Sequence, residues 1–396
     1  MDTANVDRLL AARGLRAFGD GFVSLLLPLY LLELGFGSVT VGLVASATLL
    51  GSGVMTLGVG VVAHRFAART LLLAAAALMA LTGAGFATIT QLWPLVVIAF
   101  VGTLNPSNGD VSVFAPLEHA VLAQVVDDRH RTAVFARYAL VGSLLAALGS
   151  LAAGVPALFA RSLGWPLAAA LQAMFVAYGL LGVAAAFVYR GLPRGHATGP
   201  RAAGALKHSR RAVLTLAALF SLDAFGGGLV VQSLVALWLF QRFDLSPAAA
   251  GSIFFATGVL SAVSFLVAAR VARRIGLVNT MVFTHLPANL CLIGAAFAPT
   301  LAWALALLLV RAALSQMDVP TRSAFVMAVV TPAERSAAAS FTAVPRSLAA
   351  ALAPSLAGAW FAAGWIALPL VACGVLKVGY DLALWRSRRG LRLGAD

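Results

Sequence analysis

Long apolar stretches separated by short polar breaks run along almost the whole chain. Each stretch is as long as the run of about 20 residues that crosses a bilayer as a helix, and glycine, proline or charged residues mark the breaks. The pattern therefore predicts an all-α integral membrane protein with twelve spanning helices. Their expected bounds are residues 14–34, 39–63, 70–90, 93–125, 133–159, 165–189, 212–240, 247–269, 277–297, 300–329, 336–363 and 365–385.

A degenerate internal repeat relates the two halves of the chain. The stretch from Val125 to Gly154 aligns with the stretch from Val329 to Gly358 at a constant offset of 204 residues. Repeated helical halves are how many secondary transporters build a central site. The expected organisation is an N-terminal six-helix bundle over residues 1–189, a linker over 190–211 and a C-terminal six-helix bundle over 212–396.

The net charge of +14 is distributed unevenly over the loops. Basic residues gather in alternate loops and at both ends of the chain, whereas the opposite loops hold only Arg161 and Arg242. This bias fits the positive-inside rule with both termini and the linker in the cytoplasm. The loops therefore account for the charge, and no nucleic-acid partner is expected.

The loop between the second and third predicted helices partly matches a family signature. The matching residues are Gly60, Val62, Ala63, Arg65 and Arg69, and His64 stands where the signature has an acid. A weaker copy in the second half includes Arg274. Over nearly its whole length the chain resembles the major facilitator superfamily, which implies two pseudo-symmetric six-helix bundles. These arginines either hydrogen-bond helix ends and stabilise one conformer, or serve only as topological anchors.

The resemblance also implies that helices 1, 4, 7 and 10 line a central cavity. Ionisable residues lie within these same predicted spans. They are Asp20; Asp110, Glu118 and His119; Asp223; and Arg311, Asp318 and Arg322, with Arg137 and Arg346 on helices 5 and 11. A charge facing lipid costs at least about 2.5 kcal/mol at a helix centre, so placement in the protein interior is expected.

Helix spacing places Arg311, Asp318 and Arg322 on one stripe, within about 40° of one another. One interpretation is that Asp318 changes partner between the two arginines during a transport cycle, or that the excess positive charge attracts an anion. The other interpretation is a static network that satisfies buried charges.

The fourth predicted helix contains a run of loop-forming residues from Asn105 to Asp110. Within an apolar span this run predicts a kinked or unwound helix whose freed carbonyls face a cavity. Asn105, Asn108 and Asp110 are therefore substrate candidates, unless the kink serves packing alone. Further along, Glu118 and His119 are expected to lie near Arg137 as gate partners, and Arg346 is a further gate candidate.

A carboxyl in an apolar setting favours its neutral form and can carry a coupling proton. The candidates are Asp223, Asp20, Asp110 and Glu118. Asp223 ranks first because it has no basic neighbour within helical reach, whereas Arg16 lies one helical turn before Asp20. Two further patterns are interpreted as structural. Lys377 and Asp381, one turn apart, are expected to pair with each other, and His285 is expected to be a satisfied core histidine.

These patterns favour a secondary active transporter that exports a small molecule by alternating access in exchange for protons. Uptake or facilitated diffusion of an organic anion is the alternative, and a membrane receptor is the alternative from another class. An enzyme is not expected, because neither a G-x-S-x-G turn nor an H-E-x-x-H helix occurs. No metal or cofactor is expected beyond the proton gradient. A monomer in a bacterial cytoplasmic membrane, surrounded by lipid, is the expected state.

Overall fold

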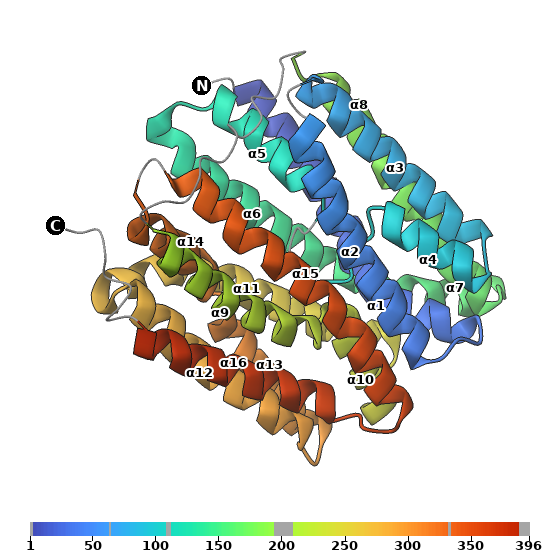
Figure 1. The fold of residues 1–396 in the computed structure, drawn as a ribbon. Coiled ribbons are helices and arrows are strands. Elements are labelled where there is room, and N and C mark those ends of the chain that lie inside the picture. Colours follow the sequence, from blue (N-terminus) through green and yellow to red (C-terminus); the bar gives the residue numbers. More distant parts are fainter. Residues whose placement is uncertain (1–2, 63–64, 108–111, 194–208, 332–333, 388–396) are drawn as a thin grey trace. The chain divides into compact units, whose positions relative to one another are not determined.

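The computed structural model describes residues 3–62, 65–107, 112–193, 209–331 and 334–387. Within these ranges the chain forms α-helices and one short 3-10 helix, and no strand (Figure 1). Clustering of contacts divides the chain into two compact units. The first comprises Met1–Gly199 and Val231–Phe255, and the second comprises Pro200–Val230 and Ala256–Asp396.

The first unit is built around α1, whose neighbours are α6, α8 and α10. Its elements are α1 (Thr3–Glu33), α2 (Ser38–Val62), α3 (Ala68–Thr88), α4 (Leu92–Val101), α5 (Phe114–Val125), α6 (Asp128–Leu151), η1 (Ala152–Gly154), α7 (Val155–Leu163), α8 (Leu167–Arg190), α10 (Gln232–Phe243) and the start of α11 (Pro247–Ile275). The helices α3 and α8 lie side by side along their length (Figure 1).

Glycines allow α1 and α6 to approach to backbone contact. A Cβ at Gly21 would lie 2.1 Å from the carbonyl oxygen of Ala146, and a Cβ at Gly149 would lie 2.0 Å from the carbonyl oxygen of Phe18. Small residues at such crossings let helices pack closely without a hydrophobic driving force. The small residues near the end of α6 therefore serve close packing.

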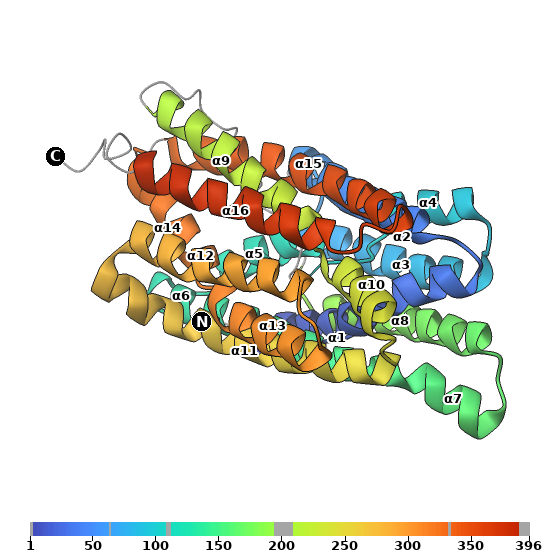
Figure 2. The same cartoon turned by 90° about the horizontal axis from the view of Figure 1, so that it is seen from below.

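The second unit packs α9 (Arg210–Gly228) against two helices from the end of the chain, α15 (Arg335–Ala362) and α16 (Leu368–Ser387) (Figure 2). Its other elements are the rest of α11, α12 (Leu277–Ala296), α13 (Leu301–Ser315) and α14 (Asp318–Val329). Leu216, Phe220, Met281 and Tyr380 belong to its buried apolar cluster. This cluster joins α9, α12 and α16 around the polar network described below.

The helix bounds agree closely with the predicted spans, but four spans are interrupted. The segment 93–125 becomes α4 and α5, 212–240 becomes α9 and α10, 300–329 becomes α13 and α14, and 133–159 passes through η1. Among the described residues, nine candidate helices are long and apolar enough to cross a membrane. The count of twelve spans therefore stays a prediction.

The surface of the first unit exposes large apolar side chains in a way that suits lipid. Leu81 is 68% exposed, Trp93 is 70% exposed and Val97 is 60% exposed. Many large apolar side chains exposed to this degree are typical of a protein surrounded by hydrocarbon chains.

The repeat is visible in the helix bounds. The helix α5 ends at Val125 and α14 ends at Val329, which are the first residues of the two aligned stretches. Both helices are 12 residues long, so their starting residues, Phe114 and Asp318, are also 204 residues apart. The offset found in the sequence therefore extends through a pair of complete helices.

The compact units do not coincide with two contiguous halves, because Val231–Phe255 packs with the first unit. The division between α9 and α10 falls directly after Gly226, Gly227 and Gly228. A Cβ at Gly228 would lie 2.4 Å from the carbonyl oxygen of Ala350, so glycine is needed where α9 meets α15. Most of the linker predicted over 190–211 lies outside the described residues.

Candidate functional site

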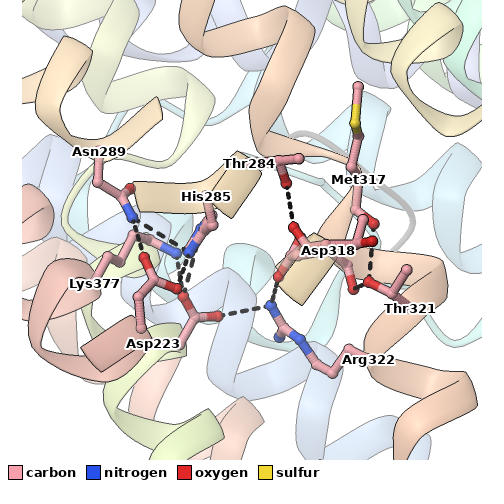
Figure 3. A network of polar contacts seen from close by, with 11 residues as sticks. Asp223, Thr284, His285, Asn289, Met317, Asp318, Thr321, Arg322 and Lys377 are labelled. Carbon is pink, nitrogen blue, oxygen red and sulfur yellow. Dashed lines mark hydrogen bonds and ion pairs between the residues drawn. The ribbon is translucent and has the colours of Figure 1, made fainter. Parts of the chain in front are cut away.

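A buried polar network lies inside the second unit, between α9, α12, α14 and α16 (Figure 3). Its central member is Asp223, which is 3% exposed. The Lys377 ammonium donates to Asp223 Oδ1 at 2.6 Å, and Arg322 Nη2 lies 3.0 Å from Asp223 Oδ2. Asp223 therefore joins two cations that come from two other helices.

His285 lies between two carboxylates. Its Nδ1 is 2.9 Å from Asp381 Oδ1, and its Nε2 is 3.9 Å from Asp223 Oδ1. The Asn289 amide, one turn along α12, donates to Asp381 Oδ2 at 3.1 Å. Both ring nitrogens thus face an acid, and Asp381 is fully buried. Neutral imidazole has one N–H donor, whereas the protonated form has two.

A further ion pair of the network joins Arg322 to Asp318, which are one turn apart on α14. The Arg322 guanidinium also lies over the Phe220 ring, 5.3 Å from its centroid. In Figure 3, Arg322 reaches Asp223 from one side, and Lys377 and His285 reach it from the other. Arg322 therefore contacts two carboxylates at once.

The prediction that Arg311 shares a stripe with Asp318 and Arg322 is wrong. It assumed one continuous helix over 300–329, but the helix is interrupted at Gln316 and Met317, between α13 and α14. Arg311 lies instead in the electrostatic range of the thiols of Cys291 and Cys373. Within the described part of the chain, its Nε has no hydrogen-bond partner.

One prediction about a local pair also needs correction. Lys377 and Asp381, expected to pair with each other, separate onto different partners: Lys377 binds Asp223, and Asp381 binds His285 and Asn289. Helical spacing identifies neighbours on one helix, and here the neighbours on other helices are better placed. His285 is the buried, hydrogen-bonded core histidine that was expected, and in addition it lies between the acids of α9 and α16.

The charge balance of this network depends on one proton. The carboxylates of Asp223, Asp318 and Asp381 face the two cations Arg322 and Lys377. Arg346 on α15 lies within electrostatic range of Asp223, but its side chain is exposed. Tyr380 on α16 packs edge-on against the His285 ring. A proton on His285 equalises the buried charges, and an uncompensated buried charge is costly.

A second buried network lies in the first unit, where Arg16 of α1 pairs with Glu118 of α5. Glu118 is fully buried and also accepts hydrogen bonds from Tyr138 and, at 2.6 Å, from Tyr189. Arg16 lies over the Phe114 ring, 4.1 Å from its centroid. The sequence suggested Arg137 as the neighbour of Glu118, but Arg137 is exposed. Glu118 instead pairs with Arg16 of α1 and accepts from tyrosines of α6 and α8.

A polar cleft lies in the same unit. The side chains that supply its polar lining are Arg13, Asp20, Asn105, Ser107, Ser143 and Gln232. It is a small cleft of about 30 Å³ that is partly open to solvent. Two of the predicted residues, Asp20 and Asn105, therefore lie at one site. Arg13 and Gln232 were not predicted, because one lies before the expected start of the first span and the other carries no charge.

The segment between α4 and α5 has the unwound form expected from its sequence, at residues 102–107. Asn105 Oδ1 accepts hydrogen bonds from the amide and the hydroxyl of Ser107, at 3.1 and 2.8 Å. The carbonyl of Pro106 accepts from the amide of Ser233 at 3.0 Å, which attaches the segment to the start of α10. The candidates Asn108 and Asp110 lie outside the described residues.

The residues predicted to act as gates lie at varied positions. Arg65, Arg137, Arg274 and Arg346 are exposed, and Arg69 is half-buried. The centroid of the His119 ring lies 5.0 Å from the ring centroids of Phe135 and Tyr138. Their gating roles stay predictions.

Comparison with known families identifies the class of protein. The family model described as Major Facilitator Superfamily matches residues 9–354. The chain belongs to the Major Facilitator Superfamily. It is therefore a multi-pass membrane transporter of a small molecule and not an enzyme, and the sequence-based expectation of this family is confirmed.

Individual relatives of this superfamily member are distant. An uncharacterised membrane protein of Saccharomyces cerevisiae is 22% identical over 417 residues, which cover 96% of this chain and 93% of the yeast protein. The crystal structure of a D-xylose–proton symporter has a TM-score of 0.75 at 16% identity, with 96% of this chain and 97% of that chain covered. The human organic anion transporter MFSD10 has a TM-score of 0.66 at 18% identity, with 96% and 99% covered. At these identities the structural likeness shows the fold alone.

Proposed function

We propose that this protein is a proton-coupled secondary transporter and that the coupling proton binds at His285, between Asp381 and Asp223. One observation carries the proposal. Three buried carboxylates are joined to two cations and one histidine, so a single proton on that histidine balances the charge. A histidine also changes charge near neutral pH more readily than any other side chain.

Protonation of His285 would alter the contacts of Asp223. Imidazolium donates from both nitrogens, so Nε2 would compete with Lys377 and Arg322 for the Asp223 carboxylate, now 3.9 Å away. Release of Arg322 from Asp223 would leave it with Asp318, one turn away on its own helix. Proton binding on α12 would thereby change how α9 is tied to α14, which is the kind of two-state element that alternating access needs.

The direction and location of transport are proposed from the sequence. Basic loops on one side support cytoplasmic termini, and the composition supports a bacterial cytoplasmic membrane. We propose export in exchange for protons as the direction. The likeness to a D-xylose–proton symporter supports proton coupling, although that protein is a symporter by name. A monomer and the absence of a cofactor are part of the same proposal.

Transport of an organic anion is a second candidate function. It is favoured by Arg311, a cation for which the described residues provide no carboxylate partner. The likeness to a human organic anion transporter supports the same candidate. Under this candidate, Arg311 would attract the anionic group of the substrate.

Flux into proteoliposomes tests the proposal. Labelled L-alanine, D-xylose and benzoate represent zwitterionic, neutral and anionic substrates, each measured with an imposed pH gradient and with the gradient collapsed by nigericin. We expect a substrate that the wild type accumulates only when the gradient is imposed and that His285→Gln merely equilibrates across the membrane, with or without the gradient. Accumulation that ignores the gradient in the wild type would refute proton coupling.

Arg311→Gln serves as the matched variant, because Arg311 lies outside the polar network. It should leave gradient-driven flux intact if the primary proposal is right. Loss of benzoate flux in Arg311→Gln, with His285→Gln unaffected, would favour the organic anion candidate.

A further inference from the structure

The Tyr380 side chain is buried beside the polar network of the second unit. The residue is 0% exposed, and within the described part of the chain its Oη has no hydrogen-bond partner. Its ring lies edge-on to the rings of His285 and Phe220, with centroids 6.1 and 6.3 Å apart. A buried tyrosine hydroxyl usually has a partner, because an unpaired one costs free energy. Packing alone therefore does not explain why a tyrosine, rather than a phenylalanine, stands here.

Arg322 carries a second buried polar atom of this kind. Its Nη2 is shared between Asp223 and Asp318, but its Nε has no hydrogen-bond partner among the described residues. The Nε–H group only donates, whereas a phenol oxygen also accepts. Both side chains adjoin the Phe220 ring, and Arg322 and Tyr380 lie within electrostatic range of each other. A charged donor and a neutral acceptor, both unpaired, thus lie beside the same ring.

Charged groups from four helices surround His285 and Tyr380. Those in the described part of the chain are Asp223 of α9, Asp318 and Arg322 of α14, Arg346 of α15, and Lys377 and Asp381 of α16. The helix α13, which also packs against α12, brings Arg311 into electrostatic range of the thiols of Cys291 and Cys373. Asp381 and Asp223 face the two ring nitrogens of His285. A charge gained by His285 therefore acts first on these acids, and through Asp223 on Arg322.

We propose that Tyr380 is a positioning residue of the coupling step, whose hydroxyl accepts a hydrogen bond from Arg322 Nε when proton binding at His285 releases Arg322 from Asp223. The entering proton stays on His285 and Tyr380 keeps its own, so only hydrogen bonds change. Without the proton, Asp223 and Asp318 share Arg322. With the proton, Asp318 and the Tyr380 hydroxyl would hold it. This inference rests on the proposed function and names a residue that stabilises its protonated state.

Melting temperatures of the purified wild type and Tyr380→Phe, measured at about pH 5.5 and about pH 8.5, test this role on either side of the range in which a histidine changes charge. The hydroxyl stabilises only the protonated state, so its contribution is present at acidic pH and is lost as the pH rises. We expect Tyr380→Phe to lower the melting temperature by about 2 °C or more at the acidic pH, because a hydrogen bond to a charged group is lost, and not to lower it at the alkaline pH. In a His285→Gln background, the difference between the two pH values should vanish.

Tyr189→Phe is the matched control, because the Tyr189 hydroxyl already donates to Glu118 at 2.6 Å in the first unit. This variant should lower the melting temperature by the same amount at both pH values. An equal loss at both pH values in Tyr380→Phe, or no loss at either, would overturn the inference. An acid-specific loss that persists in the His285→Gln background would overturn it as well, because another group would then be the one that titrates.

The melting temperatures require neither a substrate nor a gradient, so they separate this inference from the proposed function. An acid-specific loss in Tyr380→Phe, combined with wild-type flux that ignores the pH gradient, would refute proton-coupled transport and leave the contact between Tyr380 and Arg322 standing. Gradient-driven flux in the wild type, combined with an equal loss at both pH values in Tyr380→Phe, would refute the role of Tyr380 alone.

Discussion

Glu118 and Arg322 are equivalent residues of the internal repeat, and they carry opposite charges. They lie 204 residues apart, at the same position of the two 12-residue helices α5 and α14. Each forms an ion pair with the first helix of its half, Glu118 with Arg16 of α1 and Arg322 with Asp223 of α9. In each half the arginine of the ion pair also lies over a phenylalanine of the opposite helix, Arg16 over Phe114 of α5 and Arg322 over Phe220 of α9. In both halves an ion pair therefore joins the first helix, α1 or α9, to the 12-residue helix, α5 or α14. The acid and the cation are exchanged between the two halves.

The two ion pairs differ in their surroundings. Glu118 has an arginine and two tyrosine hydroxyls as donors and is fully buried. The Arg322 side chain is 11% exposed and is shared between two carboxylates. An acid held by three donors favours one arrangement, whereas a cation shared between two acids can exchange one for the other. The pair in the first unit is thus suited to stability and the pair in the second unit to switching.

The first prediction concerns the stability of the Arg16–Glu118 pair. Glu118→Gln leaves the Arg16 charge buried without its acid, and breaking a buried pair costs about 3–5 kcal/mol. We expect a marked fall in the melting temperature of the purified protein, measured by fluorescence-detected size-exclusion chromatography after heating. The double exchange Arg16→Glu with Glu118→Arg should recover part of the loss. Tyr189→Phe, which removes one neutral donor, should cost about 1 kcal/mol. Equal melting temperatures for Glu118→Gln and the wild type would show that the pair is not stabilising.

The second prediction separates coupling from folding in the other network. Asp223→Asn leaves Lys377 and Arg322 beside a neutral group, so the link between α9 and α14 loses its charge. Gradient-driven flux should be lost, while exchange of substrate across the proteoliposome membrane at equal pH stays measurable. Adding Lys377→Gln to Asp223→Asn should improve the yield of folded protein without restoring coupling, because one unpaired cation is removed. Full gradient-driven flux in Asp223→Asn would exclude this carboxylate from the coupling step.

The sequence predicted the helices far better than the contacts between them. Apolar runs located most of the outer ends of the spans but not the interruptions within four of them, although the loop-forming residues after Leu104 predicted the unwound segment. Helical spacing, however, reports only neighbours on the same helix. It therefore paired Lys377 with Asp381 and missed His285, whose partners come from α9 and α16. The equivalence of Glu118 and Arg322 was also not recognised from the sequence, because an acid aligned with a base counts as a mismatch between the two repeats.

The third prediction concerns topology. Cysteines introduced at His196 and Ala203, in a background with Cys291→Ala and Cys373→Ala, should be cytoplasmic, because the surrounding segment is basic and free of acids. An impermeant maleimide should label them after lysis and leave them unlabelled on intact cells. A cysteine at Arg161, in the loop expected on the opposite side, is the control and should be labelled without lysis. Labelling of His196→Cys on intact cells would reverse the proposed orientation of both termini.

The last prediction concerns the crossing of α1 and α6 beside the polar cleft. Gly21 lies against the backbone of Ala146, and a Cβ would stand 2.1 Å from its carbonyl oxygen. Backbone cannot rotate away as a long side chain can, so Gly21→Ala must push the two helices apart. Overpacking of this kind costs about 1–3 kcal/mol, and we expect a lower melting temperature. Gly58→Ala, which meets open space, should leave the melting temperature unchanged. If Gly21→Ala and Gly58→Ala melted at the same temperature, the close approach of α1 and α6 would not contribute to stability.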